Sequence, residues 1–230
     1  MALDVVGAAR SPSTYRLRLM ILGVAVVAIA AWWAVAPPWV IAAIPGPNSG
    51  SAAAGSGNLN PTKYVDSIWA SRLLPTVERS AIELPQLISD LKADPAGAIK
   101  QFGNVPTVGG PAAFIVKGVA RVVSEGNGFP QTVSIAMGPS DRAIAAIQVG
   151  PILLGTDVRD AMRFINFNQF LNQVNYGEVA LAINTRILQT TLDRLDVNGL
   201  KGRVISFTGA FTYSSLSAIV ITPITIEVSR

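Results

Sequence analysis

Apolar residues are unevenly distributed along the chain, and their longest run covers residues 19–44, which contain no charged residue. As a helix, residues 19–36 would extend about 27 Å, close to the ~30 Å hydrocarbon core of a bilayer. The Pro37-Pro38 pair would end this helix. Three arginines precede the run and the next charge is Lys63. The positive-inside rule therefore predicts a cytoplasmic N-terminus, with the rest of the chain outside.

A cleaved signal peptide is the alternative interpretation, because it also has a basic start and an apolar middle. Its apolar part normally covers about 7–15 residues, and the run here is longer. Pro37 also follows the small-residue site at 34–36, where cleavage would occur, and is unfavourable there. We therefore favour an uncleaved anchor and expect four parts: a cytoplasmic basic tail (1–18), a membrane anchor (19–44), a flexible linker (45–59) and an extracytoplasmic domain (60–230).

Helical spacing marks the beginning of this domain. Asn60-Pro61 is typical of a helix start, with Asn as the N-cap and Pro in the first turn. The apolar residues that follow recur at helical intervals as far as position 74. Pro75 and Pro85 are expected to break the pattern, giving shorter helices over 82–91 and 95–102.

Period-two alternation then predicts strands, which we expect at 114–125, 132–137, 143–149, 203–213 and 218–228. In the last of these, Val220 and Ile224 are expected on the same side, and Pro223 argues for an edge position or a bulge. A helical region separates the third and fourth strands. It begins at Thr156 or Asp157 and includes a long amphipathic helix that starts at a capping box of Asn175 and Glu178.

This order of elements predicts an α+β fold. An N-terminal transmembrane helix is followed by short helices packed on a five-stranded barrel. A helix between strands three and four is the order found in OB-folds. The helical insert at that position, about 40 residues, is longer than is typical.

Composition excludes several kinds of chemistry. The chain has no Cys and no His, which rules out disulfides, Ser-His-Asp triads and the usual ligands of structural zinc. Asp196 to Gly199 resembles part of a calcium loop, but Arg194 and Ile205 stand where carboxylates are required. No phosphate-binding loop, dinucleotide fingerprint or nucleophile elbow is present. We therefore expect no catalytic residue, metal or cofactor, and a protein that is not an enzyme. The alternative is an unrecognised hydrolase, for instance one that uses a Ser-Lys pair.

Net charge gives little support for nucleic-acid binding, although the sequence pI is about 9.7. Part of the excess comes from the three arginines of the tail. From residue 45 onward, 15 basic residues face 13 acidic ones, a net charge of +2. The second and third expected strands carry neither the aromatic nor the cationic residues of nucleic-acid-binding OB-folds. We expect no nucleic-acid partner.

The segment 166–175 is unusually rich in amides placed among aromatic residues. Amides beside aromatic rings suit sugar or peptide recognition, so Asn168, Phe170, Asn172 and Gln173 are candidate contacts for a ligand or partner. The alternative is structural, since amides also cap helices and satisfy buried backbone groups.

Five segments together resemble a bacterial family of predicted periplasmic or lipoprotein domains, the domain of unknown function 2291. The segments are YVDSIWASRLLP (64–75), ADPAGAIKQFG (93–103), FIVKGVARVV (114–123), residues 147–184, and VISFTGAF with ITPITIEV (204–228). The resemblance implies an extracytoplasmic OB-like domain associated with sugar ABC transporters. Some members carry a lipid-attachment Cys that this chain lacks, so its anchor would be the apolar helix itself.

We therefore expect a membrane-tethered accessory or binding protein on the outer side of the cytoplasmic membrane, associated with a carbohydrate ABC uptake system. Its partners would be the membrane and either transporter components or a solute-binding protein. Two alternatives remain open: a module that binds a small sugar or oligosaccharide directly, and a structural envelope interaction protein.

Overall fold

The computed structural model describes residues 60–126 and 128–229. The expected tail (1–18), anchor (19–44) and linker (45–59) lie outside these residues. Within the described ranges, no helix combines the length and hydrophobicity that crossing a bilayer would require.

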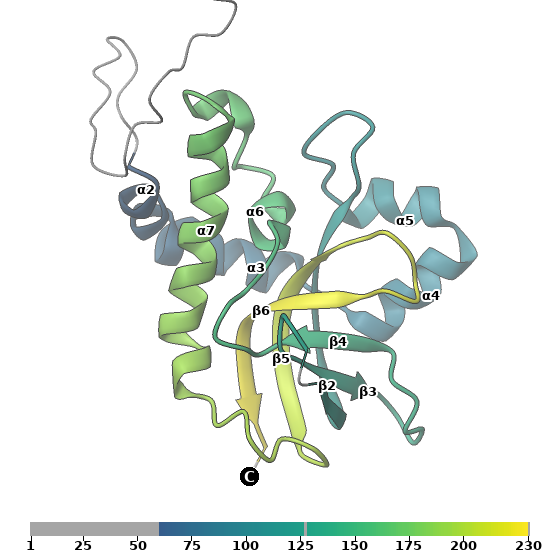
Figure 1. The fold of residues 1–230 in the computed structure, drawn as a ribbon. Helices are drawn as coiled ribbons and strands as arrows, with labels where there is room; N and C mark the ends of the chain where they lie inside the picture. Colours follow the sequence, from purple (N-terminus) through teal and green to yellow (C-terminus); the bar gives the residue numbers. More distant parts are fainter. Residues whose placement is uncertain (1–59, 127, 230) are drawn as a thin grey trace, which may run out of the picture. The chain divides into compact units, whose positions relative to one another are not determined.

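Five strands close into a barrel (Figure 1). Neighbouring strands are antiparallel except β4 and β6, which are parallel, and β2 closes the barrel by pairing with β5 as well as β3. The prediction of an α+β fold with an OB-like five-stranded barrel is therefore confirmed. The strands are β2 (Ala113–Gly126), β3 (Thr132–Ala136), β4 (Ala145–Gln148), β5 (Val204–Thr212) and β6 (Val220–Val228).

Alternate side chains of the strands fill the barrel. On β2 the even-numbered positions from Phe114 to Val122 are buried, while the odd-numbered positions include the exposed Lys117 and Val119. Phe114 stacks on Phe211 of β5 with 5.6 Å between ring centroids. The period-two pattern thus separated the inward from the outward positions of β2 and β5 correctly.

A β-bulge lies where Pro223 occurs in β6, which confirms the bulge rather than the edge position. The register with β5 shifts between Thr208 and Gly209, and Gly209 pairs with Pro223. The extra residue reverses the alternation on β6. As a result Val220 is exposed while Ile224 is buried, so the expectation that they share one side is wrong.

The helices before the barrel differ from expectation at both prolines. Pro75 does not end the first helix, because a π-helical turn, in which the Leu74 N–H bonds to the Trp69 carbonyl, carries the chain into the next helix. Pro85 fits only the first turn of a helix, so the helix begins at Leu84. The two residues before it form a short parallel strand on β2 instead of the expected helix. The elements are α2 (Pro61–Ile68), η1 (Trp69–Leu73), α3 (Leu74–Ser80), β1 (Ile82–Glu83), α4 (Leu84–Ala93) and α5 (Pro95–Phe102).

Between β4 and β5 the chain forms α6 (Asp157–Ala161), η2 (Phe167–Gln169), α7 (Gln173–Thr190) and η3 (Leu192–Arg194). The Asn172 side chain caps α7, three residues before the expected cap at Asn175. Asn172 is the cap because its backbone is extended, as an N-cap requires, whereas Asn175 already lies within the helix. α6 packs on β2, β5 and β6, and α7 packs on α2 (Figure 1).

Candidate functional site

A buried polar network fixes α6 to the barrel, beginning at its first residue. Asp157 accepts hydrogen bonds from the hydroxyls of Thr212 on β5, at 2.6 Å, and Thr222 on β6, at 2.8 Å. The Thr222 hydroxyl in turn accepts from the amide of the buried Gln148 at 2.9 Å. Burial raises the pKa of the Asp157 carboxyl, and the two hydroxyl bonds oppose this shift in part. Both carboxyl oxygens are engaged, so Asp157 holds α6 in place.

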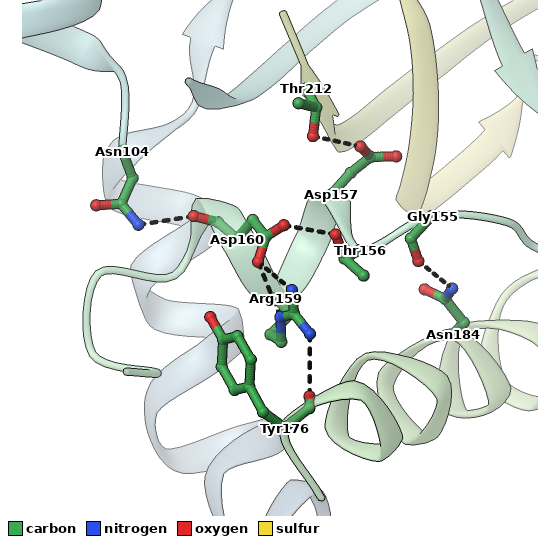
Figure 2. Close-up of polar contacts among 9 residues, drawn as sticks. All are labelled: Asn104, Gly155, Thr156, Asp157, Arg159, Asp160, Tyr176, Asn184 and Thr212. Carbon is green, nitrogen blue, oxygen red and sulfur yellow. Dashed lines mark hydrogen bonds and ion pairs between the residues drawn. The ribbon is translucent and has the colours of Figure 1, made fainter. Parts of the chain in front are cut away.

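Arg159 and Asp160 extend the network to the start of α7, as Figure 2 shows. Arg159 is 8% exposed, and its Nε and Nη2 donate to one carboxylate oxygen of Asp160 at 2.8 and 2.7 Å. Its Nη1 donates to the backbone carbonyl of Tyr176 at 3.0 Å. The guanidinium also lies over the side chain of Tyr176, 3.7 Å from the centre of the phenol ring. The Thr156 hydroxyl donates to the second Asp160 oxygen.

Two amides complete the network around α6. Asn104, which follows α5, donates to the backbone carbonyl of Asp160 at 2.7 Å. On α7, Asn184 donates to the Gly155 carbonyl at 3.1 Å, just before α6 begins. The short helix α6 is therefore tied to β5, α7 and the end of α5, as Figure 2 shows, and to β6 through Thr222. This arrangement fixes the direction in which the chain leaves α6.

The last residue of α6 and the residues that follow it form one wall of a groove of about 600 Å³. The other walls come from the ends of α3 and α5 and the first residues of β2. Polar side chains are contributed by Thr76, Arg79, Ser80, Gln101 and Arg163, and apolar ones by Ala81, Ile82, Phe102, Ala113, Ile115, Ala161 and Phe164. This groove combines aromatic rings, hydroxyls, an amide and two guanidinium groups, so it is the candidate functional site.

The charge of the groove is positive. No carboxylate lines it, and within the described residues neither Arg79 nor Arg163 forms an ion pair. Each guanidinium is oriented by one backbone carbonyl. Arg79 Nε donates to Pro75 at 3.1 Å and Arg163 Nη2 to Gly103 at 2.9 Å, which leaves other N–H groups of both for a ligand. The groove can therefore bind a carboxylate, a phosphate or neighbouring hydroxyls.

One aromatic wall of the groove is held by a further cation. The Arg72 guanidinium lies 4.2 Å from the centre of the Phe164 ring. Such a contact fixes the ring plane. Phe102, at the end of α5, is half-buried in the same groove. The rings of Phe164 and Phe102 provide flat apolar surface for a sugar or another planar group.

A second groove, of about 650 Å³, lies between the end of α7 and the last residues of β6. Arg194 and Arg203 line it together with Asp196 and Glu227, so its charges are mixed. The residues that line it, all between positions 190 and 228, include no aromatic ring. It offers less distinctive chemistry than the groove beside α6.

The residues predicted from the sequence lie elsewhere. Phe170 is buried and packs on the Tyr64 ring at 5.3 Å between centroids. Asn172 caps α7 by accepting from the backbone N–H of Asn175 at 2.9 Å. Asn168 and Gln173 are exposed. None of the four predicted residues lines either groove, and their contact with a ligand or partner stays a prediction.

Sequence reasoning missed the groove because its residues come from distant segments. Arg79, Phe102 and Arg163 share no motif and no periodicity. Only the packing of α3, α5 and α6 around the start of β2 brings them together. Both arginines have an acidic residue at helical spacing, Glu83 after Arg79 and Asp160 before Arg163, so no local signal distinguished them from ordinary surface charges.

Comparisons with known proteins are consistent with this fold. A family model described as "predicted periplasmic lipoprotein (DUF2291)" matches residues 26–227. The crystal structure of an OB-fold protein from Thermotoga maritima is similar with a TM-score of 0.61 at 16% identity, covering 75% of this chain and 100% of that one. At this identity the likeness shows the fold alone. A search of curated proteins finds no match.

Proposed function

We propose a function on the premise that this chain belongs to the DUF2291 family of predicted periplasmic lipoproteins. The family description supports an extracytoplasmic accessory protein that is associated with the membrane. Within that class, we assign it the role of a non-enzymatic accessory protein of a carbohydrate ABC uptake system. The family match is the observation that carries this proposal.

The proposed tether is the apolar run at residues 19–44. Lipid attachment needs a cysteine, and these 230 residues contain none. The family match begins at residue 26, so residues 26–44 of the apolar run are part of what this chain shares with the family. The three arginines before it support an orientation with the N-terminus in the cytoplasm and the barrel outside.

Purification of crosslinked membranes tests the proposed partner. The tagged full chain is expected to bring down a permease or solute-binding component of a carbohydrate transporter, and an equally abundant tagged single-pass protein is expected not to. Recovery of other envelope proteins without transporter components would favour the structural envelope role. Recovery of the chain alone would contradict the accessory role.

Direct sugar binding is the second candidate function, and the groove beside α6 favours it. Its two guanidinium groups and its aromatic rings suit a sugar that carries an acidic group. Hydrogen bonds to charged groups contribute about 1.5–3 kcal/mol each. Changing Arg79 and Arg163 together to alanine removes two such bonds and is therefore expected to weaken binding by about a hundredfold or more.

Calorimetry on the full chain in detergent, with a panel of neutral and acidic sugars, measures this effect. The matched control is Arg121→Ala, which removes an arginine from the barrel surface outside the groove lining. The control is expected to bind as the unmodified chain does. An absence of binding heat with every sugar would remove this candidate function.

A further inference from the structure

Three large apolar side chains are exposed within eight residues of the chain, just before and at the start of α7. Phe167 is 47% exposed, Leu171 62% and Val174 68%, and we call these three residues the apolar tip. They belong to a stretch, 164–177, that contains no charged residue. Clustered exposed apolar side chains mark interaction surfaces more often than isolated ones do. The groove described above does not include them.

The apolar tip is presented by an ordered scaffold. Below it, Phe170 packs against Tyr64 at 5.3 Å and against Tyr176 at 5.5 Å between ring centroids. The Phe167 ring also meets Tyr176 edge-on at 5.7 Å. The side chain of Asn172 fixes the start of α7. The exposure of the tip is thus a property of a packed structure that orients these side chains outward.

The tip lies beside α2, where the described chain begins. Tyr64, which contacts Phe170, is one helical turn after the cap residue Asn60. The sequence-predicted linker, 45–59, joins Asn60 to the apolar run. A chain of 15 residues with this composition has a root-mean-square span of about 20 Å. A tether at residue 44 would therefore keep a bilayer within reach of the tip at high effective concentration.

We propose that the apolar tip contacts the outer surface of the cytoplasmic membrane. Phe167, Leu171 and Val174 enter the boundary between headgroups and acyl chains, a depth of about 5–10 Å for interfacial elements. The exposed amides of Asn168 and Gln173 remain at headgroup level and form hydrogen bonds there. This inference rests on the membrane tether of the proposed function.

Size and charge favour a lipid surface over a protein partner. Stable protein interfaces use about 20–30 residues on each side, far more than the three side chains of the tip. Because the stretch 164–177 has no charge, the contact is apolar and does not need anionic lipid. It is therefore expected in neutral and anionic bilayers alike, with little dependence on salt.

The absence of cysteine from the chain allows a direct test. Leu171→Cys and Val174→Cys each receive an environment-sensitive fluorophore, and the full chain is placed in nanodiscs of phosphatidylethanolamine and phosphatidylglycerol. The matched control is Asn198→Cys, at an exposed site beyond the opposite end of α7. Labels at the tip are expected to shift to shorter emission wavelengths and to be quenched by spin-labelled lipid, whereas the control is not. Nanodiscs of phosphatidylcholine are expected to give the same result.

Every other outcome contradicts the membrane contact of the tip, the tether or both. Tip labels that behave like the control, in a chain that has entered the discs, overturn the membrane contact and leave the tether intact. A shift in emission without lipid quenching overturns it in favour of a protein partner or a second copy. A chain that fails to enter the discs refutes the tether, and the tip contact falls with it. As a further check, Phe167→Asp in the Leu171→Cys chain is expected to abolish the shift.

Discussion

Replacing Arg159 by alanine is expected to lower the free energy of unfolding by about 3–5 kcal/mol, because it removes one partner of a buried ion pair. Asp160 would keep its negative charge with its side chain only 13% exposed. Of its side-chain partners, the Thr156 hydroxyl would remain, while both guanidinium bonds would be lost. The carbonyl of Tyr176 would lose a donor as well. The effect comes mainly from leaving a carboxylate desolvated and poorly paired.

Urea denaturation of the full chain in detergent, followed by circular dichroism, measures this loss. Arg121→Ala is the matched control, because its ion pair with Asp141 is exposed, at 40% and 81% for the two side chains. Exposed pairs contribute about 0–1 kcal/mol. Equal losses in the two variants would show that the network around α6 does not stabilise the fold as the geometry indicates.

Alanine at Gly209 is expected to lower the free energy of unfolding by about 1–3 kcal/mol, the usual cost of overpacking a filled interior. An added Cβ would lie 2.6 Å from the Thr222 carbonyl oxygen and 2.6 Å from Cγ2 of Ile221. The oxygen belongs to the backbone beside the bulge and cannot rotate away. The strands β5 and β6 would have to separate where Pro223 already interrupts their register.

The same measurement on Gly177→Ala supplies a control of opposite sign. Gly177 lies within α7, and nothing is within 4 Å of an added Cβ. Alanine is favoured over glycine in a helix by about 0.5–1 kcal/mol, so this variant is expected to be more stable. If Gly209→Ala were as stable as the unmodified chain, the close approach of β5 and β6 at the bulge would be disproved.

The barrel could be predicted because local pattern and tertiary packing agree in its strands. On β5 the residues Ile205, Phe207 and Phe211 alternate with polar ones, and the interior of the barrel buries all three. Such alternation is present in the sequence before any contact forms. The start of α2 at Asn60 was predicted for the same reason, since a cap acts within three residues.

Predictions were wrong where a distant segment decided the local structure. Ile82 and Glu83 continue a helical pattern, but β2 offers them an unpaired edge, and they pair with Val116 and Lys117. Pro75 was expected to end a helix, and a π turn accommodates it instead. In both places a weak local preference was outweighed by packing against the barrel.

By itself the sequence determined the order of the barrel strands along the chain, the inward faces of β2 and β5 and the absence of cysteine and histidine chemistry, because these depend on residue type and short-range spacing. It also predicted the apolar run at residues 19–44 as an anchor. Only the tertiary structure assembled the groove of Arg79 and Arg163, whose residues come from segments far apart in the chain. The apolar tip lies in the segment that the sequence had already marked as a candidate contact, but only the structure shows which of its apolar side chains are exposed and that Tyr64 of a distant helix supports it. No short-range pattern records which segments meet, since closure of the barrel and the network around α6 set those distances.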